Sequence, residues 1–135
     1  MNFKISVAEL IDRLTVDHIK QFKFNYYNSD LEKEINLIIK DINFLLDEKK
    51  IELTSKIIRP LIILSHINLY IWNIKDQMKD DSENYDQLLK LAHQLNGTRN
   101  QIKNKLLELF NEKNLSTSRS NFETDGLENW NVNNM

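Results

Sequence analysis

At 135 residues the chain has the length of one domain, and its apolar fraction of 41% is ordinary for a globular protein. Two glycines and one proline are too few for the many turns of an all-β sandwich or barrel, so the composition favours helices. A net charge of −2 without a basic stripe predicts that the protein does not bind DNA. The absence of cysteine excludes disulfides and thiolate ligands; it is compatible with a reducing compartment, and we expect a cytoplasmic protein.

Two serine–glutamate pairs mark the predicted starts of the first two helices. Ser6 with Glu9, and Ser29 with Glu32, have the spacing of a capping box, in which the serine oxygen accepts from a first-turn amide. The first helix is predicted over about residues 7–25, and the second from Ser29 to the charged stretch near residues 48–52. One apolar line recurs along the second helix in steps of three and four: Leu31, Ile35, Ile38, Ile42 and Leu45.

The third predicted helix, to about Lys79 with Thr54 as its N-cap, is apolar on nearly all sides and is therefore expected to be central. Pro60 predicts either a kink in this helix or a later start near Arg59. Its longest unbroken apolar stretch, residues 60–64, is far shorter than the roughly 20 residues of a spanning helix. We therefore expect a buried core helix and no membrane span.

A polar loop at residues 80–84 separates the third helix from a fourth. The fourth helix is predicted from one line of residues at helical spacing: Leu88, Ala92, Leu95, Arg99, Ile102, Leu106 and Leu109. After residue 113 the pattern dissolves into polar residues, which cannot bury enough apolar surface to fold. The predicted fold is all-α, an antiparallel bundle of four main helices over residues 1–113, with a disordered C-terminal tail over residues 114–135.

Arg99 is the polar residue that departs most clearly from the pattern, because it lies on the apolar line of the fourth helix. A buried guanidinium needs a partner, and Asp76 on the third helix is the predicted one. If the two helices pair antiparallel, two polar faces are predicted to meet: Asn68, Trp72, Asp76 and Lys79 with Asn96, Arg99 and Lys103. This set is either a structural network that fixes register or a site for a small anionic ligand.

Two secondary candidate sites use other residues. Glu9 and Asp12 share one face of the first helix, but the sequence offers too few facing acids for a metal site, and no cofactor is predicted. Arg59 and His66 resemble the R-x4-6-H motif of HEPN-type helical ribonucleases, which implies metal-free attack on RNA across a dimer interface. Pro60 departs from that motif, which usually has a polar residue after the arginine.

Three segments together resemble a family of small bacterial all-helical domains of unknown function. Residues 5–15, ISVAELIDRLT, are similar to the E-L-I-D-K/R-L-T opening of that family. Its later motifs resemble two further sets: Asn68-x-x-Ile71-Trp72 followed by Asp76 and Lys79, and Asn96-x-x-Arg99 followed by Lys103. Lys75 departs from the family, which tends to have glutamate there. The resemblance covers most of residues 5–112 and implies no particular reaction; such domains are sometimes encoded near glycosyltransferase genes.

The sequence thus leaves two functions open. The first is a non-catalytic helical binding or interaction module, forming a homodimer through surplus apolar surface on the second or third helix. The alternative is an enzyme acting on a nucleotide, a sugar phosphate or RNA, which would use Arg99, Lys103 and Asp76, or Arg59 with His66.

Overall fold

The computed structural model describes residues 5–24 and 28–113, and these residues form four helices and no strand. The helices are α1 (Val7–Phe24), α2 (Ser29–Lys49), α3 (Ser55–Asp80) and α4 (Tyr85–Leu109). The prediction of an all-α antiparallel bundle of four helices is confirmed. The predicted tail at residues 114–135 lies outside the described residues.

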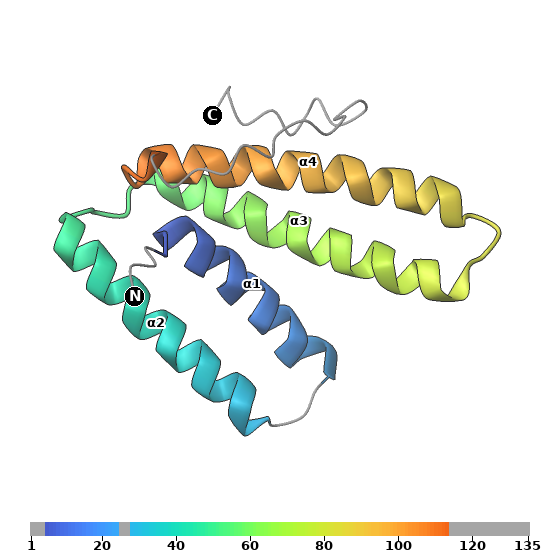
Figure 1. Cartoon of the computed structure of the whole chain (residues 1–135), viewed down its shortest axis with the longest axis horizontal. Coiled ribbons are helices and arrows are strands. Elements are labelled where there is room, and N and C mark those ends of the chain that lie inside the picture. The colour runs from blue at the N-terminus through green and yellow to red at the C-terminus, as the bar shows by residue number, and fades with distance from the viewer. Residues whose placement is uncertain (1–4, 25–27, 114–135) are drawn as a thin grey trace.

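The hairpin of α3 and α4 is the most extensively packed part of the fold. The two helices run side by side along their whole lengths (Figure 1) and make the most extensive contact of any pair. Their facing residues form most of the core: Leu64, Ile67, Ile71 and Ile74 from α3, with Leu95, Ile102 and Leu106 from α4, and Phe110 just beyond.

The helix α3 begins before Pro60, so the predicted alternative of a later start near Arg59 is wrong. The amides of Ile57 and Ile58 both donate to the carbonyl of Thr54, and Pro60 lies buried in the second turn. Among the described helices, α3 alone is long and apolar enough to cross a membrane, and core helices of soluble proteins share these properties. Because α4 and α1 cover two of its sides, α3 has the surroundings expected of a core helix.

The helix α1 lies between the α3–α4 hairpin and α2 (Figure 1). Its start is as predicted, because the Ser6 hydroxyl accepts from the Glu9 amide at 2.9 Å. The start of α2 differs by one residue. The side chain of Asn28, and not of Ser29, accepts from the amides of Asp30 and Leu31, because the residue that keeps extended backbone geometry before the helix is the one whose side chain can reach those amides.

The helix α2 is the least covered of the four. It packs against α1 and makes few contacts with α3 or α4. Of its large apolar side chains only Ile35 and Ile38 are buried, whereas Leu37, Ile39 and Phe44 are exposed. The edge of the bundle formed by α2 is therefore exposed to solvent.

Candidate functional site

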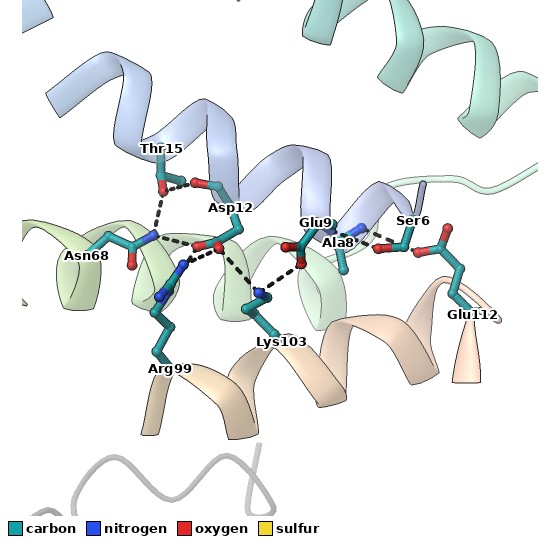
Figure 2. A network of polar contacts seen from close by, with 9 residues as sticks. All are labelled: Ser6, Ala8, Glu9, Asp12, Thr15, Asn68, Arg99, Lys103 and Glu112. Atoms are coloured by element: carbon teal, nitrogen blue, oxygen red, sulfur yellow. Dashed lines mark hydrogen bonds and ion pairs between the residues drawn. The ribbon is translucent and has the colours of Figure 1, made fainter. Parts of the chain in front are cut away.

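A buried carboxylate on α1, that of Asp12, is the centre of a polar network that joins three helices (Figure 2). The Arg99 guanidinium of α4 donates through Nε to Asp12 Oδ1 at 3.2 Å and through Nη2 to Oδ2 at 2.5 Å. From α3, Asn68 Nδ2 donates to Asp12 Oδ1 at 2.8 Å. The Nζ atom of Lys103 lies 3.4 Å from Asp12 Oδ2 and 2.8 Å from Oε2 of Glu9.

Helical spacing explains why these groups converge. Glu9, Asp12 and Thr15 follow one another at steps of three on α1, and Arg99 and Lys103 are four residues apart on α4, so each set shares one face of its helix. Thr15 closes the network: its hydroxyl donates to the Asp12 carbonyl at 2.7 Å and accepts from Asn68 Nδ2 at 2.6 Å. Each of these side chains therefore has a partner from a different helix or turn.

The network is electrically neutral, since it contains two carboxylates and two cations. Burial raises the pKa of Asp12, but the Arg99 guanidinium, the Asn68 amide and the Lys103 ammonium together outweigh burial and hold this pKa below its ordinary value of 3.8. Asp12 is therefore ionised at neutral pH. Arg99 and Lys103 keep only part of their surface in contact with solvent, and their charges are already matched by Asp12 and Glu9.

The predicted pair of Asp76 and Arg99 is wrong. Asp76 instead lies 3.7 Å from Lys79, its neighbour on the same helix, and both side chains are exposed. The physical reason is register. Asp76 lies four residues before the end of α3, whereas Arg99 lies fourteen residues after the start of α4, which separates their levels along the hairpin by roughly 15 Å. Counting outward from the loop at residues 81–84 would have shown this mismatch.

The structure brings some of the other predicted residues into the network and leaves others out. Glu9 and Asp12, predicted only as secondary candidates, are central to it, whereas Asn96 is half-buried and does not pair with Asn68. Trp72 instead packs against Phe24 of α1, with ring centroids 6.2 Å apart at an angle of 75°.

Arg59 and His66 lie apart from the network. Both are exposed on α3, seven residues from each other and therefore on one side of that helix. Within the described ranges, no group of three or more histidine, aspartate or glutamate side chains is placed to hold a metal ion.

Glu112, a residue that the sequence analysis did not single out, lies at the other end of the contact between α1 and the α3–α4 hairpin. Its carboxylate is almost fully buried and accepts from the amides of Val7 and Ala8, at 2.8 and 3.3 Å, at the first turn of α1. Lys49 Nζ lies 3.6 Å from the same carboxylate. In a capping box the glutamate of the first turn reaches back to the start of the helix, but Glu9 is engaged with Lys103, and Glu112 comes from the opposite end of the described chain. No local pattern indicates such a contact.

A second buried carboxylate lies between α1 and α2. Asp17 is 4% exposed, and its Oδ2 atom has no hydrogen-bond partner within the described part of the chain. Burial, followed by the neighbouring Glu34 carboxyl of α2, raises the pKa of Asp17 to about 6. The α1–α2 contact therefore contains an acid that favours its protonated form more than an ordinary aspartate does.

Comparisons with protein-family models, curated proteins and solved structures gave no match.

Proposed function

We propose that this protein is a non-catalytic helical docking module, in which the Asp12 network holds α1 against the α3–α4 hairpin and an apolar face binds another protein. The network favours a structural role because its charges cancel and its members satisfy one another. A buried, mutually satisfied set of this kind fixes which helices meet and in what register. A small anionic ligand would have to displace a carboxylate from Arg99 or Lys103, so anion binding is the less favoured reading of the same residues.

The direction in which each side of α1 points follows from its contacts. Glu9 pairs with Lys103 of α4, so the opposite side of α1 points away from α4. A step of 100° per residue puts Ile11, His18 and Phe22 on that opposite side. Phe22 is 85% exposed, which is unusual for a phenylalanine within a described helix.

The side of α3 that points away from α4 is also apolar. Ile67 and Ile74 are buried in the hairpin core. The opposite side of α3, at 180° from them on the helix, carries Ile58, Ile62 and Leu69. All three are substantially exposed, with Ile62 at 51%.

The helix α2 continues this surface on the far side of α1. Lys20, three turns after Glu9 and so on the same side of α1, lines an open depression together with Glu34 of α2. The charged flank of α2 is therefore on the Glu9 side. Its other flank carries Ile39, which is exposed, Leu46, which is partly buried, and Glu32, whose carboxylate accepts from Gln21 of α1.

Eight residues on α2, α1 and α3 thus share one side of the molecule, away from α4. We call them the apolar face: Ile11, His18, Phe22, Ile39, Leu46, Ile58, Ile62 and Leu69. Scattered exposed apolar residues are normal on a protein surface, but a contiguous apolar face marks an interaction site. The exposure of large apolar side chains from all three helices on this side, above all Phe22 at 85%, is the single observation that carries the proposal.

Site-specific photo-crosslinking in the native host tests the docking function. Phe22 is replaced by the photoreactive analogue p-benzoyl-phenylalanine, and in a matched control Leu37, which is 61% exposed on the outer side of α2, is replaced instead. We expect an adduct with a second polypeptide from position 22 and none from position 37. No adduct from position 22, or an adduct within the same chain, would overturn the docking function.

The ribonuclease alternative has one supporting observation, the exposure of Arg59 and His66 on one side of α3 beside the apolar face. Its test is cleavage of a single-stranded RNA by the purified protein. Cleavage that is lost in His66→Ala and in Arg59→Ala, with both variants folded, would favour the enzyme over the docking module.

A further inference from the structure

We propose that the first half of α2, residues 29–38, is a pH-sensitive strap, which closes on α1 while Asp17 is protonated and is released as Asp17 loses its proton. The inference concerns the contact between α1 and α2, which differs from the apolar face, and it does not depend on the docking function proposed above.

Asp17 lies on the side of α1 that faces the strap. Its carboxyl group is next to that of Glu34, and Gln21, one turn later on the same side of α1, donates to the Glu32 carboxylate at 3.0 Å. Asp17 is 4% exposed, and its Oδ2 atom has no hydrogen-bond partner among the described residues. An ionised carboxylate in this place loses its water without gaining a donor at Oδ2, whereas the protonated form carries no charge to solvate. The closed strap therefore favours the protonated acid.

The charged groups that act on Asp17 come from both helices of this contact. Glu34 of α2 repels a negative charge at Asp17, whereas Lys20 and His18 of α1 attract it. His18 is exposed and Lys20 lines an open depression, so water weakens both attractions. Burial and Glu34 together outweigh the two basic side chains, and this balance raises the pKa of Asp17 to about 6.

Little apolar burial holds the strap in place. Its buried apolar side chains are Ile35 and Ile38, and neither belongs to the main core around the α3–α4 hairpin. The second half of α2 is anchored separately, because Ile42 packs against that core and Lys49 Nζ lies 3.6 Å from the buried Glu112 carboxylate. Segments with few buried apolar contacts open locally at the lowest cost. A change of charge at one buried acid therefore acts on a segment that is easily released.

The direction of the pH effect follows from linkage. When the strap is released, Asp17 faces water and has its ordinary pKa of 3.8, whereas in the closed form its pKa is about 6. Below pH 3.8 both forms hold the proton. Above that pH the released form loses the proton first, so release becomes easier as the pH rises, until both forms are ionised above pH 6. Between pH 5 and pH 8 the equilibrium constant for release is therefore expected to rise about tenfold.

Hydrogen exchange of the full chain at pH 5 and pH 8 tests the inference. The quantity compared is the protection factor, which corrects for the effect of pH on the chemical rate of exchange. We expect the protection of amides 33–38 to fall about tenfold from pH 5 to pH 8. At both pH values it should stay below the protection of amides in the middle of α3, because release of the strap leaves the α3–α4 hairpin folded.

Three variants identify the group responsible. Asp17→Asn has nearly the shape of the protonated acid and cannot ionise, so its strap should be equally protected at pH 5 and pH 8. The matched control is Asp41→Asn, an exposed acid of α2, which should keep the tenfold change. His18→Gln removes the neighbouring histidine and should keep it as well. Circular dichroism checks that all three variants are folded.

Four results would overturn the inference. The first needs no variant: a wild-type strap with the same protection at pH 5 and pH 8. The second and third are a change that persists in Asp17→Asn and a change that disappears in His18→Gln, because either assigns the pH dependence to another group. The fourth is equal protection of the strap and the middle of α3, which would show that the strap opens only when the whole chain unfolds.

Discussion

At the scale of single residues, the position of one carboxylate decides which helices meet. Asp12 faces both α3 and α4, and its two oxygens accept from Asn68 and Arg99 at the point where the three helices converge. An apolar residue at position 12 would keep the packing of α1 on the hairpin but would remove this polar constraint on its register. The paired charges permit one register, since any other leaves buried charge without a partner.

The importance of Asp12 is tested against the exposed acid Asp76. We expect Asp12→Ala to lower the free energy of unfolding by about 2–3 kcal/mol, because it leaves the Arg99 guanidinium partly buried and unpaired. We expect Asp76→Ala to change it by less than about 0.5 kcal/mol, because its ion pair with Lys79 is exposed. Urea unfolding of both variants measures this difference, and equal effects would contradict the structural role of the network.

The dependence of stability on pH is expected to combine two opposing acids. The pKa of Asp17 is raised from 3.8 to about 6, so between these values the folded state binds a proton that the unfolded state does not, and stability rises as the pH falls through 6. The pKa of Asp12 is lowered, so its contribution is present above pH 3.8 and is lost as the pH falls below it. Thermal unfolding from pH 7 to pH 3 should therefore show stability that first rises and then falls.

Substitution separates the contribution of Asp17. The variant Asp17→Asn should lose the rise between pH 7 and pH 5 and keep the loss in acid, whereas Asp41→Asn, exposed on the same α1–α2 hairpin, should behave like the wild type. A rise that persists in Asp17→Asn would show that another group causes it.

At the scale of elements, the start of α1 depends on a residue from the far end of the described chain. The first amides of any helix have no partner within it. Here Ser6 satisfies the amide of Glu9, and Glu112 satisfies those of Val7 and Ala8. The negative charge of Glu112 also lies at the positive end of the α1 dipole. The contact ties the segment after α4 to the first turn of α1.

Removal of this cap has a specific expected cost. Glu112→Ala leaves the two buried amides of Val7 and Ala8 without acceptors, so we expect a loss of about 2–3 kcal/mol in the free energy of unfolding. Glu108→Ala removes an exposed glutamate one turn earlier and should cost less than about 0.5 kcal/mol. Denaturant unfolding compares the two, and a loss of similar size in both would argue against the cap.

At the scale of the whole molecule, the four helices are unequally supported. The α3–α4 hairpin holds most of the core, α1 contacts all three other helices, and α2 is held mainly by α1 (Figure 1). Local opening is easiest where few apolar contacts must be broken. The free energy of local opening is therefore expected to be highest in the α3–α4 hairpin, lower in α1 and lowest in α2.

Hydrogen exchange measures that order directly. We expect the amides of α2 to exchange fastest among the four helices and those in the middle of α3 and α4 to exchange slowest. Slow exchange in α2 that matches α3 would contradict the open edge described above.

Local pattern determined the four helices and most of their boundaries. Apolar residues at steps of three and four predict α2 and α4 correctly, because helix formation depends on neighbours within a turn or two. The cap of α2 moved by one residue to Asn28 because several nearby side chains are capable of capping. The same periodicity placed Arg99 on a buried line and so found one member of the polar network.

Only the tertiary structure determined which carboxylate pairs with Arg99. Periodicity records the direction in which a side chain leaves its helix but not which of several helices lies there, and Asp12 and Asp76 were both available acids. Packing resolved that choice by register along the hairpin and by the placement of α1, and it brought Glu112 to Val7 across 105 residues of sequence. Contacts between distant segments depend on the three-dimensional arrangement of whole helices, and for that reason no short stretch of this sequence encodes them.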